Sequence, residues 1–187
     1  MNATAPRPIV VAATTNAGKL RELRRLLADT GVEVWSLADV PDAPAVVEDG
    51  ATFAANARKK ALACARHCGL PALADDSGLE VDALGGAPGV RSARFAGEDA
   101  DDAANVAKLL AALRDVADPD RRARFRCVVV LALPTGATVL AEGTCEGRIT
   151  RERRGGGGFG YDPVFLYEPE GRTFAELDPD TKNRVSH

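Results

Sequence analysis

Two adjacent carboxylates among small residues are the strongest chemical signal in this 187-residue sequence. Asp75 and Asp76 lie within Ala74–Gly78, directly after a short apolar run over residues 70–74. Such a run indicates a buried strand, so we expect the two aspartates at its end. Paired carboxylates suit a hard cation such as Mg²⁺, which prefers oxygen ligands and shares itself with substrate phosphates. The structural alternative is an Asp-Ser-Gly turn held by side-chain caps.

A second signal lies where the first expected strand passes into the first expected helix. The residues at this junction are Thr14, Thr15, Asn16, Ala17, Gly18 and Lys19. Backbone amides at a helix start point outward and the helix dipole favours anions, so a phosphate fits there. Lys19 adds a mobile positive charge. The spacing is not that of a Walker P-loop, and a plain helix cap with a surface lysine is the alternative.

A third group surrounds the start of the helix that Thr52 is expected to cap. Glu48 precedes this helix, so a carboxylate lies close to its N-terminus. Asn56 and Lys60 are four residues apart and therefore share one face of the helix. That face adjoins the apolar stripe, which would place both side chains at the edge of a cleft.

The glycine-rich segment Gly155–Asp162 combines backbone freedom with two aromatic residues and an acid. Phe159, flanked by glycines, is poorly placed for an ordinary core and can stack on a base. Lys182 and His187 are further candidate polar contacts, although such residues near a chain end are more often merely exposed.

The elements expected to position these residues alternate early in the chain and form a hairpin later. Strands are expected near residues 9–13, 32–35, 79–81, 124–133, 138–146 and 164–166, and helices near residues 20–27, 52–68 and 101–113. This order favours an α/β fold in which helices flank a mixed sheet. A length of 187 residues fits a single domain, with one or two lobes.

Composition excludes several classes of protein. A net charge of -3 gives no general attraction to nucleic acid. No apolar run approaches the roughly 18 residues of a membrane span, and residues 1–8 lack the apolar core of a signal peptide. The four cysteines include no CxxC pair, which favours a reducing compartment over a disulfide framework or a zinc site. We therefore expect a soluble, cytoplasmic protein with no nucleic-acid partner.

Together these segments resemble the inosine/xanthosine triphosphate pyrophosphatases of the Ham1/RdgB type, from about residue 9 to the last residue. The matching segments, in order, are Thr14–Lys19, Glu48 with Thr52–Asn56, Asp75–Leu79, Gly85–Val90 with Ser92–Arg94, Phe159–Asp162, and Lys182–His187. Each motif alone is modest, but the six-part order is specific. One departure is that the family pattern continues with an arginine and a C-terminal helix. Either the sequence is incomplete at this end, which we expect, or base recognition here lacks that arginine.

The resemblance implies a mixed, twisted sheet in a single two-lobed domain over residues 1–187, with the substrate in a cleft between the lobes. It also implies a homodimer that hydrolyses ITP, dITP and XTP to the monophosphate and pyrophosphate. In this assignment Glu48 and Asp76 bind Mg²⁺, Asp76 is the proposed proton acceptor, and Ser77 contacts substrate. The residues expected around the base and sugar are Phe159, Gly160, Tyr161, Asp162, Lys182 and His187.

Chemical reasoning leaves the division of labour between the aspartates open. A carboxylate that binds Mg²⁺ directly is a weaker base, so Asp75 or Asp76 could accept the proton from water. Lys19 and Lys60 would neutralise phosphate charge, with Asn56 beside them. Selection of hypoxanthine and xanthine requires a donor facing the purine 6-oxygen, and His187 is a candidate. Two rivals are a Maf-type nucleotide pyrophosphatase and a nucleotide-binding sensor without turnover.

Overall fold

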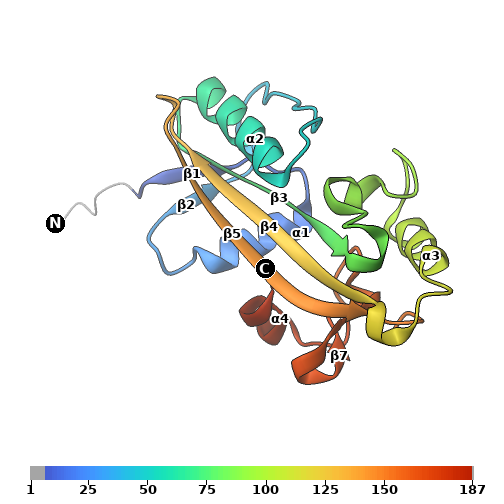
Figure 1. Ribbon diagram of the computed structural model, residues 1–187. Helices are drawn as coiled ribbons and strands as arrows, with labels where there is room; N and C mark the ends of the chain where they lie inside the picture. The colour runs from blue at the N-terminus through green and yellow to red at the C-terminus, as the bar shows by residue number, and fades with distance from the viewer. Residues whose placement is uncertain (1–6, 187) are drawn as a thin grey trace. The chain divides into compact units, whose positions relative to one another are not determined.

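The computed structural model describes residues 7–186 (Figure 1). Within this range, seven strands form one sheet in the order β2-β1-β3-β4-β5-β6-β7. The chain divides into two compact units. The first unit runs as far as Asp76 and includes Val128–Ala141, whereas the second comprises Ser77–Cys127 and the chain from Glu142 onward. The predicted α/β class with a mixed sheet and flanking helices is confirmed.

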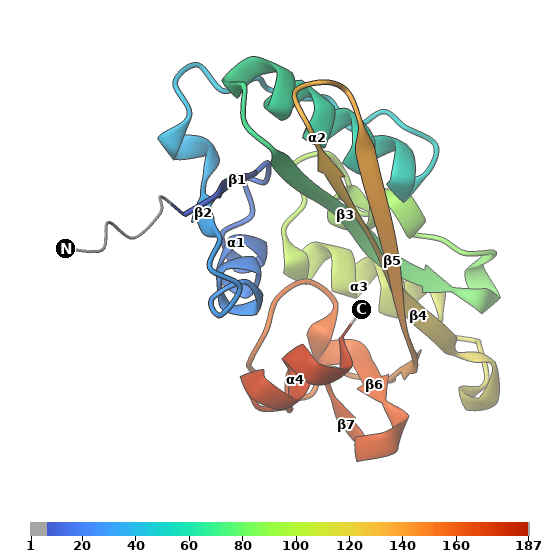
Figure 2. The same ribbon diagram turned by 90° about the vertical axis from the view of Figure 1, so that its left-hand side faces the viewer.

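The first unit is built from parallel strands joined by helices. Strand β1 (Ile9–Ala12) pairs in parallel with β2 (Glu33–Trp35) on one side and with β3 (Ala72–Val81) on the other. Helix α1 (Ala17–Leu26) connects β1 to β2, and α2 (Phe53–Cys68) connects β2 to β3. Because these crossovers run in opposite directions along the sheet, the right-handed rule places the two helices on opposite faces, as Figure 2 shows.

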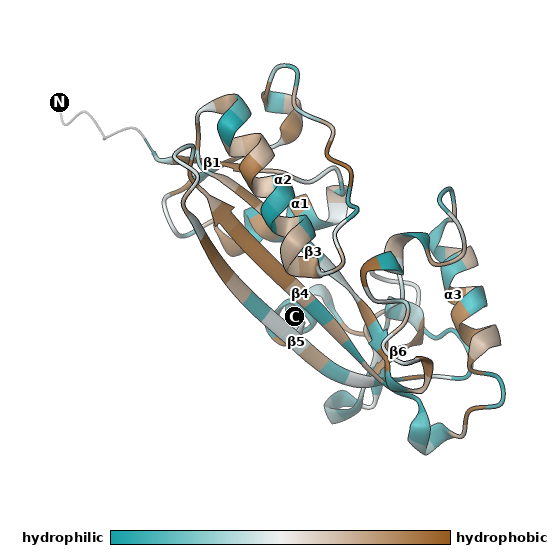
Figure 3. Ribbon diagram, turned by 45° about the horizontal axis from the view of Figure 1, so that its top comes forward, coloured by the Kyte–Doolittle hydropathy of each residue, from teal (hydrophilic) through white to brown (hydrophobic). Residues whose placement is uncertain are grey.

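Helix α2 forms where the sequence predicted it. The Thr52 side chain accepts a hydrogen bond from the Ala55 N–H at 3.1 Å, which caps the helix start. Gly69, in the left-handed conformation at φ 68°, ends the helix. The residues of its buried face are Phe53, Asn56, Ala57, Ala61, Cys64 and Ala65. This face lies against the apolar part of the sheet coloured brown in Figure 3.

The predicted hairpin and third helix are also confirmed. Strands β4 (Arg122–Ala132) and β5 (Thr138–Ile149) flank a turn in which the Leu133 N–H donates to the Ala137 carbonyl at 2.9 Å. Helix α3 (Asp102–Ala112) is capped by the preceding residue, Asp101, whose carboxylate accepts from the Ala104 N–H.

The remaining regular elements are short. They are β6 (Phe165–Tyr167), β7 (Arg172–Thr173), α4 (Pro179–Val185), and the 3₁₀ turns Leu37–Asp39, Asp82–Leu84, Gly89–Arg94, Asp118–Asp120, Asp162–Val164 and Glu168–Glu170. Strands β5, β6 and β7 pair antiparallel in sequence.

The core of the second unit is aromatic. Phe125, Phe165 and Phe174 lie with ring centroids 4.6 to 5.7 Å apart, a spacing at which aromatic rings attract beyond simple burial. The core of the first unit is made instead of small side chains, because α2 presents a row of alanines to the sheet. The small side chains allow helix and sheet to approach closely.

The extent of β3 was predicted wrongly. The sequence indicated brief strand character at residues 79–81, with the aspartates at a strand end, but β3 is continuous from Ala72 to Val81. Asp75 and Asp76 therefore lie in its middle. Aspartate and glycine are disfavoured in strands, and here pairing with neighbouring strands overrides that preference.

Within residues 7–186, no helix is long and apolar enough to span a membrane. All four cysteines lie in this range, and none forms a disulfide.

Candidate active site

The strand position of the two aspartates separates their side chains. Successive residues of a strand point to opposite faces of the sheet, and the burial of β3 alternates accordingly. Asp75 forms an ion pair with Lys19 of α1, with 2.5 Å between Nζ and Oδ2. Asp76 accepts a hydrogen bond from the Asn56 amide of α2 at 2.9 Å. Since α1 and α2 cover opposite faces of the sheet, each aspartate contacts a different helix.

The junction between β1 and α1 is ordered by its own side chains. The Asn16 carboxamide oxygen accepts from the backbone N–H groups of Gly18 at 2.8 Å and Lys19 at 3.2 Å. Thr14 Oγ1 accepts from the Asn16 N–H at 3.2 Å. Thr15, Asn16 and Ala17 are exposed, so this helix start is open to an anion. A phosphate bound to the Gly18 and Lys19 amides would replace the Asn16 cap.

Asn56 was expected at the edge of a cleft, where it would contact substrate, but it is only 1% exposed. Its Nδ2 donates to Asp76, and its Oδ1 accepts from the Gly50 N–H at 2.7 Å. A Cβ at position 50 would lie 2.5 Å from that oxygen, so the loop before α2 needs glycine there. Asn56 therefore orients Asp76 and anchors the loop that carries Glu48.

Glu48 reaches the same region as Asp76. Lys60, one turn after Asn56 on α2, forms an ion pair with Glu48 at 3.0 Å. Burial raises the pKa of Asp76; the Asn56 hydrogen bond and the charge of Lys60 oppose this shift, whereas the charge of Glu48 adds to it. A cation between the two carboxylates would relieve their mutual repulsion. The two lysines would attract the phosphates of a substrate.

The donor set fits a magnesium ion. Glu48 and Asp76 offer carboxylate oxygens, and Mg²⁺ is commonly held by one or two carboxylates together with substrate phosphates and water. Among residues 7–186, no group of three or more His, Cys, Asp or Glu side chains is arranged to hold a metal by itself. Two carboxylates would leave the other positions around Mg²⁺ to water and to substrate phosphates.

A second cluster of predicted residues lies in the second unit. Asp162 is 3% exposed and accepts from Lys182 Nζ at 2.7 Å and from the Phe159 N–H at 2.9 Å. Lys182 Nζ also lies 4.5 Å from the centroid of the Phe159 ring, a cation–π distance. The Phe159 ring itself is 39% exposed. Asp162 and Lys182 thus hold an aromatic side chain that is accessible for stacking.

Other members of the predicted site have structural roles. The Tyr161 ring is 5% exposed and its hydroxyl donates to the Ser92 carbonyl at 2.8 Å, so this ring belongs to the core. The Gly160 N–H donates to the Asp102 carboxylate at 2.7 Å. Ser77 is half-buried on β3. His187 lies outside the described residues.

Sequence reasoning did not assign roles to two residues of the second cluster. Ser92 lay in a matching motif, and its hydroxyl accepts from the Leu79 N–H at 2.8 Å. Asp102 follows Asp101, and one acid is enough to cap α3. The presence of a second acid at that helix start could have indicated a role for Asp102, because its carboxylate is left over for a partner elsewhere in the chain.

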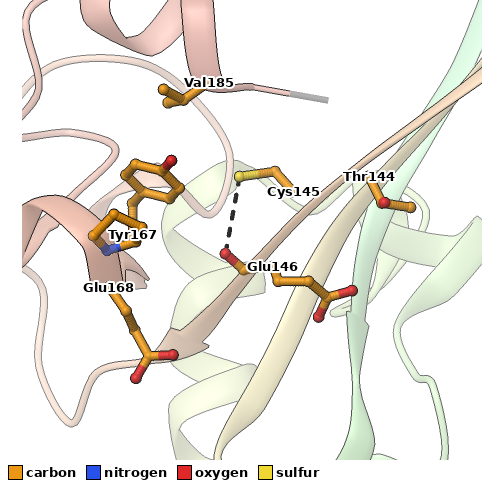
Figure 4. A pocket seen from close by; sticks show the side chains of 7 residues that line it. Thr144, Cys145, Glu146, Tyr167, Glu168 and Val185 are labelled. Carbon is orange, nitrogen blue, oxygen red and sulfur yellow. Dashed lines mark hydrogen bonds between the residues drawn. The ribbon is translucent and has the colours of Figure 1, made fainter.

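Two cavities in the structure are not lined by any predicted site residue. The larger, of about 600 Å³, lies in the second unit, where Cys145, Tyr167 and Val185 line it (Figure 4). The smaller, of about 320 Å³, lies in the first unit beside Trp35 and His67. Neither contains the paired charges of the two clusters.

The chain is similar to a known family, to curated relatives and to solved structures. The sequence model of the Ham1 family matches residues 10–187. The chain is 56% identical over 178 residues to a dITP/XTP pyrophosphatase of Geobacillus kaustophilus, covering 95% of this chain and 87% of the relative. It is 60% identical over 179 residues to a dITP/XTP pyrophosphatase of Syntrophobacter fumaroxidans, covering 96% and 76%. A solved Ham1 protein from Coxiella burnetii superposes with a TM-score of 0.89 at 45% identity, covering 96% of this chain and 92% of that one.

Proposed function

Because this chain belongs to the Ham1 family, we propose that it is a pyrophosphatase that hydrolyses ITP, dITP and XTP to the monophosphate and pyrophosphate. The observation that supports this most strongly is the meeting of Asp76, Glu48 and Lys60 in the first unit. Relatives named dITP/XTP pyrophosphatases match over most of their length. The products would return a damaged purine nucleotide to the monophosphate pool.

The first unit handles the triphosphate in this proposal. The open start of α1, from Thr14 to Lys19, offers amides and a positive dipole end to the phosphates. Lys19 and Lys60 lower the negative charge that would repel an attacking water. Asp75 positions Lys19 through their ion pair. Its carboxylate is thereby committed to a cation, which makes it the weaker candidate for the base.

Asp76 takes the proton of the attacking water. Its Oδ2 is held by Asn56, so we assign the proton to Oδ1. Burial raises the pKa of this carboxyl, which opposes the loss of basicity that a bound Mg²⁺ would cause. The water oxygen bonds to the α-phosphorus while the α–β phosphoanhydride bond breaks, and pyrophosphate leaves with the electron pair of the broken bond.

We propose Mg²⁺ as the metal, held by Glu48 and Asp76. When bound, it supplies charge neutralisation for the phosphates and lowers the pKa of nearby water. Glu48 is kept in place for this role by Lys60.

The second unit recognises the base. The exposed Phe159 ring stacks on the purine, and Lys182 and Asp162 fix that ring. Discrimination against adenine requires a donor to the purine 6-oxygen, because adenine presents an amino group there and leaves the donor unpaired. His187 and nearby backbone amides are the candidates in this sequence for that donor.

The family resemblance also bears on the oligomeric state. We propose a homodimer, which predicts a mass of about twice the 19.6 kDa of one chain. Sedimentation equilibrium at micromolar concentration tests it, and a single species at the mass of one chain would contradict it.

A cytoplasmic location stays a prediction from the cysteine pattern.

A nucleotide panel tests the proposed function. Pyrophosphate release is measured with ITP, dITP, XTP, ATP, GTP, dUTP and TTP, with and without Mg²⁺. We expect release from ITP, dITP and XTP only when Mg²⁺ is present. A preference for dUTP or TTP would favour a Maf-type enzyme, and binding of ITP without release would favour a sensor.

A further inference from the structure

We propose that Asp102 is a positioning residue for base recognition, and that it acts by fixing the backbone on one side of Phe159. This inference rests on the proposed function for its consequence, but its geometry belongs to the second unit alone. Asp102 is the first residue of α3, more than fifty residues before the glycine-rich segment.

The Asp102 carboxylate is not needed to cap its own helix. The neighbouring Asp101 accepts from the Ala104 N–H at 2.7 Å and thereby performs that role. The Asp102 carboxylate instead accepts from the Gly160 N–H at 2.7 Å. Two adjacent acids thus have separate partners, one local and one distant in sequence.

The two peptide groups on either side of the Phe159 Cα are held by different carboxylates. The Phe159 N–H belongs to the preceding peptide and donates to Asp162. The Gly160 N–H belongs to the following peptide and donates to Asp102. Because each peptide group is planar, fixing both planes fixes the two backbone dihedrals of Phe159, and with them the direction of its side chain.

Without these two hydrogen bonds, the flanking glycines would leave the backbone of Phe159 flexible. Gly158 and Gly160 have φ of 73° and 58°, conformations that glycine adopts at little cost. Any side chain at position 158 would also collide with the Asp162 carboxylate. The glycines permit the turn, and the two carboxylates select one conformation of it.

Three features hold the aromatic platform, which we define as Phe159 with its two flanking glycines. Asp162 and Lys182 hold it from within the core, and the Tyr161 hydroxyl anchors the next residue to Ser92. Asp102 is the only one of these contributors that is exposed. Its removal should therefore loosen the platform with little loss of core packing.

The test compares Asp102→Ala with Asp101→Ala as a matched control, since both remove an exposed acid at the start of α3. We expect Asp102→Ala to raise KM for dITP and XTP about tenfold, as for loss of one charge-assisted hydrogen bond, with kcat within about twofold. Inhibition by inorganic tripolyphosphate, which has no base, should be unchanged. Asp101→Ala should leave all three quantities near wild type.

The conservative variant separates a hydrogen bond from a charge effect. Asp102→Asn retains an acceptor for the Gly160 N–H, so we expect its KM to lie within about threefold of wild type. A KM as high as that of Asp102→Ala would overturn the assignment, because charge alone would then be the cause. Equal KM values for wild type and Asp102→Ala would overturn it too.

A measurement that needs no turnover keeps the inference distinct from the proposed function. The Gly160 amide should be protected from hydrogen exchange in wild type and in Asp101→Ala, and exchange at least tenfold faster in Asp102→Ala. If wild type fails to hydrolyse dITP but this pattern holds, the function is wrong and the positioning role stands. Unchanged Gly160 exchange in Asp102→Ala would refute the positioning role itself.

Discussion

Asp75 and Asp76 have different roles although they are consecutive in the sequence. They are adjacent in sequence, yet one is bound to the Lys19 ammonium and the other to the Asn56 amide. The sequence predicted that both belong to the site but left open which would act as base. The alternation of a strand is what separates them, and this required knowing that β3 is continuous through both.

Asn56 provides a residue-scale prediction. Asn56→Ala should lower kcat about a hundredfold, because Asp76 loses its orientation. It should also destabilise the fold by about 2 kcal/mol, because the partly buried Gly50 N–H loses its acceptor. The matched control is Asn105→Ala, since Asn105 is also buried and bonded to the backbone of Ala93 and Ala96.

Denaturant midpoints and dITP turnover are measured for both variants. The control should lose similar stability and keep near-normal kcat at temperatures where it is folded. Equal losses of kcat in the two variants would mean that Asn56 acts only through stability.

Thiol reactivity gives a pH-dependent prediction. Burial raises the pKa of Cys64 to about 12 and that of Cys145 to about 11. Both stay protonated near pH 8, so iodoacetamide should label Cys68 and Cys127 first, as peptide mass spectrometry would report.

The sign of the linked stability follows from the same shifts. A raised pKa means that the folded state keeps the thiol proton up to a higher pH than the unfolded state does. The stability linked to these two thiol protons is fully present below the unfolded pKa of about 9. It is lost as pH rises through the folded pKa values of about 11 for Cys145 and about 12 for Cys64. Rapid labelling of Cys64 at pH 8 in folded protein would contradict the burial of this thiol.

At the scale of elements, helices and the hairpin were predictable because their signals are local. Thr52 and Gly69 mark the ends of α2, and Pro134 with Gly136 marks the turn between β4 and β5. The central part of β3 was not predictable, because its residues favour turns and only its neighbours in the sheet make it a strand. The conflict between local preference and fold falls at the candidate catalytic residues.

Arg121 supports a prediction about an element junction. It is 2% exposed and donates to the carbonyls of Leu113, Ile149 and Thr150, at distances of 2.6 to 2.8 Å. Arg121→Met should lower the free energy of unfolding by about 3 kcal/mol, because it leaves buried carbonyls without donors. Arg122→Met, at an exposed neighbour, should change it by less than about 0.5 kcal/mol. Comparable thermal midpoints for the two variants would show that the buried guanidinium network is dispensable.

At the scale of the whole molecule, most of the predicted site residues that the structure describes fall into two groups, one in each unit. Glu48, Asn56, Lys60 and Asp76 meet in the first unit, and Phe159, Asp162 and Lys182 in the second. The sequence predicted membership of both groups through motif order. It could not predict that Asn56, Tyr161 and Asp162 would be buried, because burial depends on packing between segments distant in the chain.

The central claim is that Asp76 accepts the proton during pyrophosphate release, and Asp76→Asn tests it most directly beside Asp75→Asn. With dITP and Mg²⁺, we predict that Asp76→Asn lowers kcat at least about a thousandfold, whereas Asp75→Asn, which loosens only Lys19, lowers it about tenfold. Near-normal pyrophosphate release by folded Asp76→Asn would contradict the account.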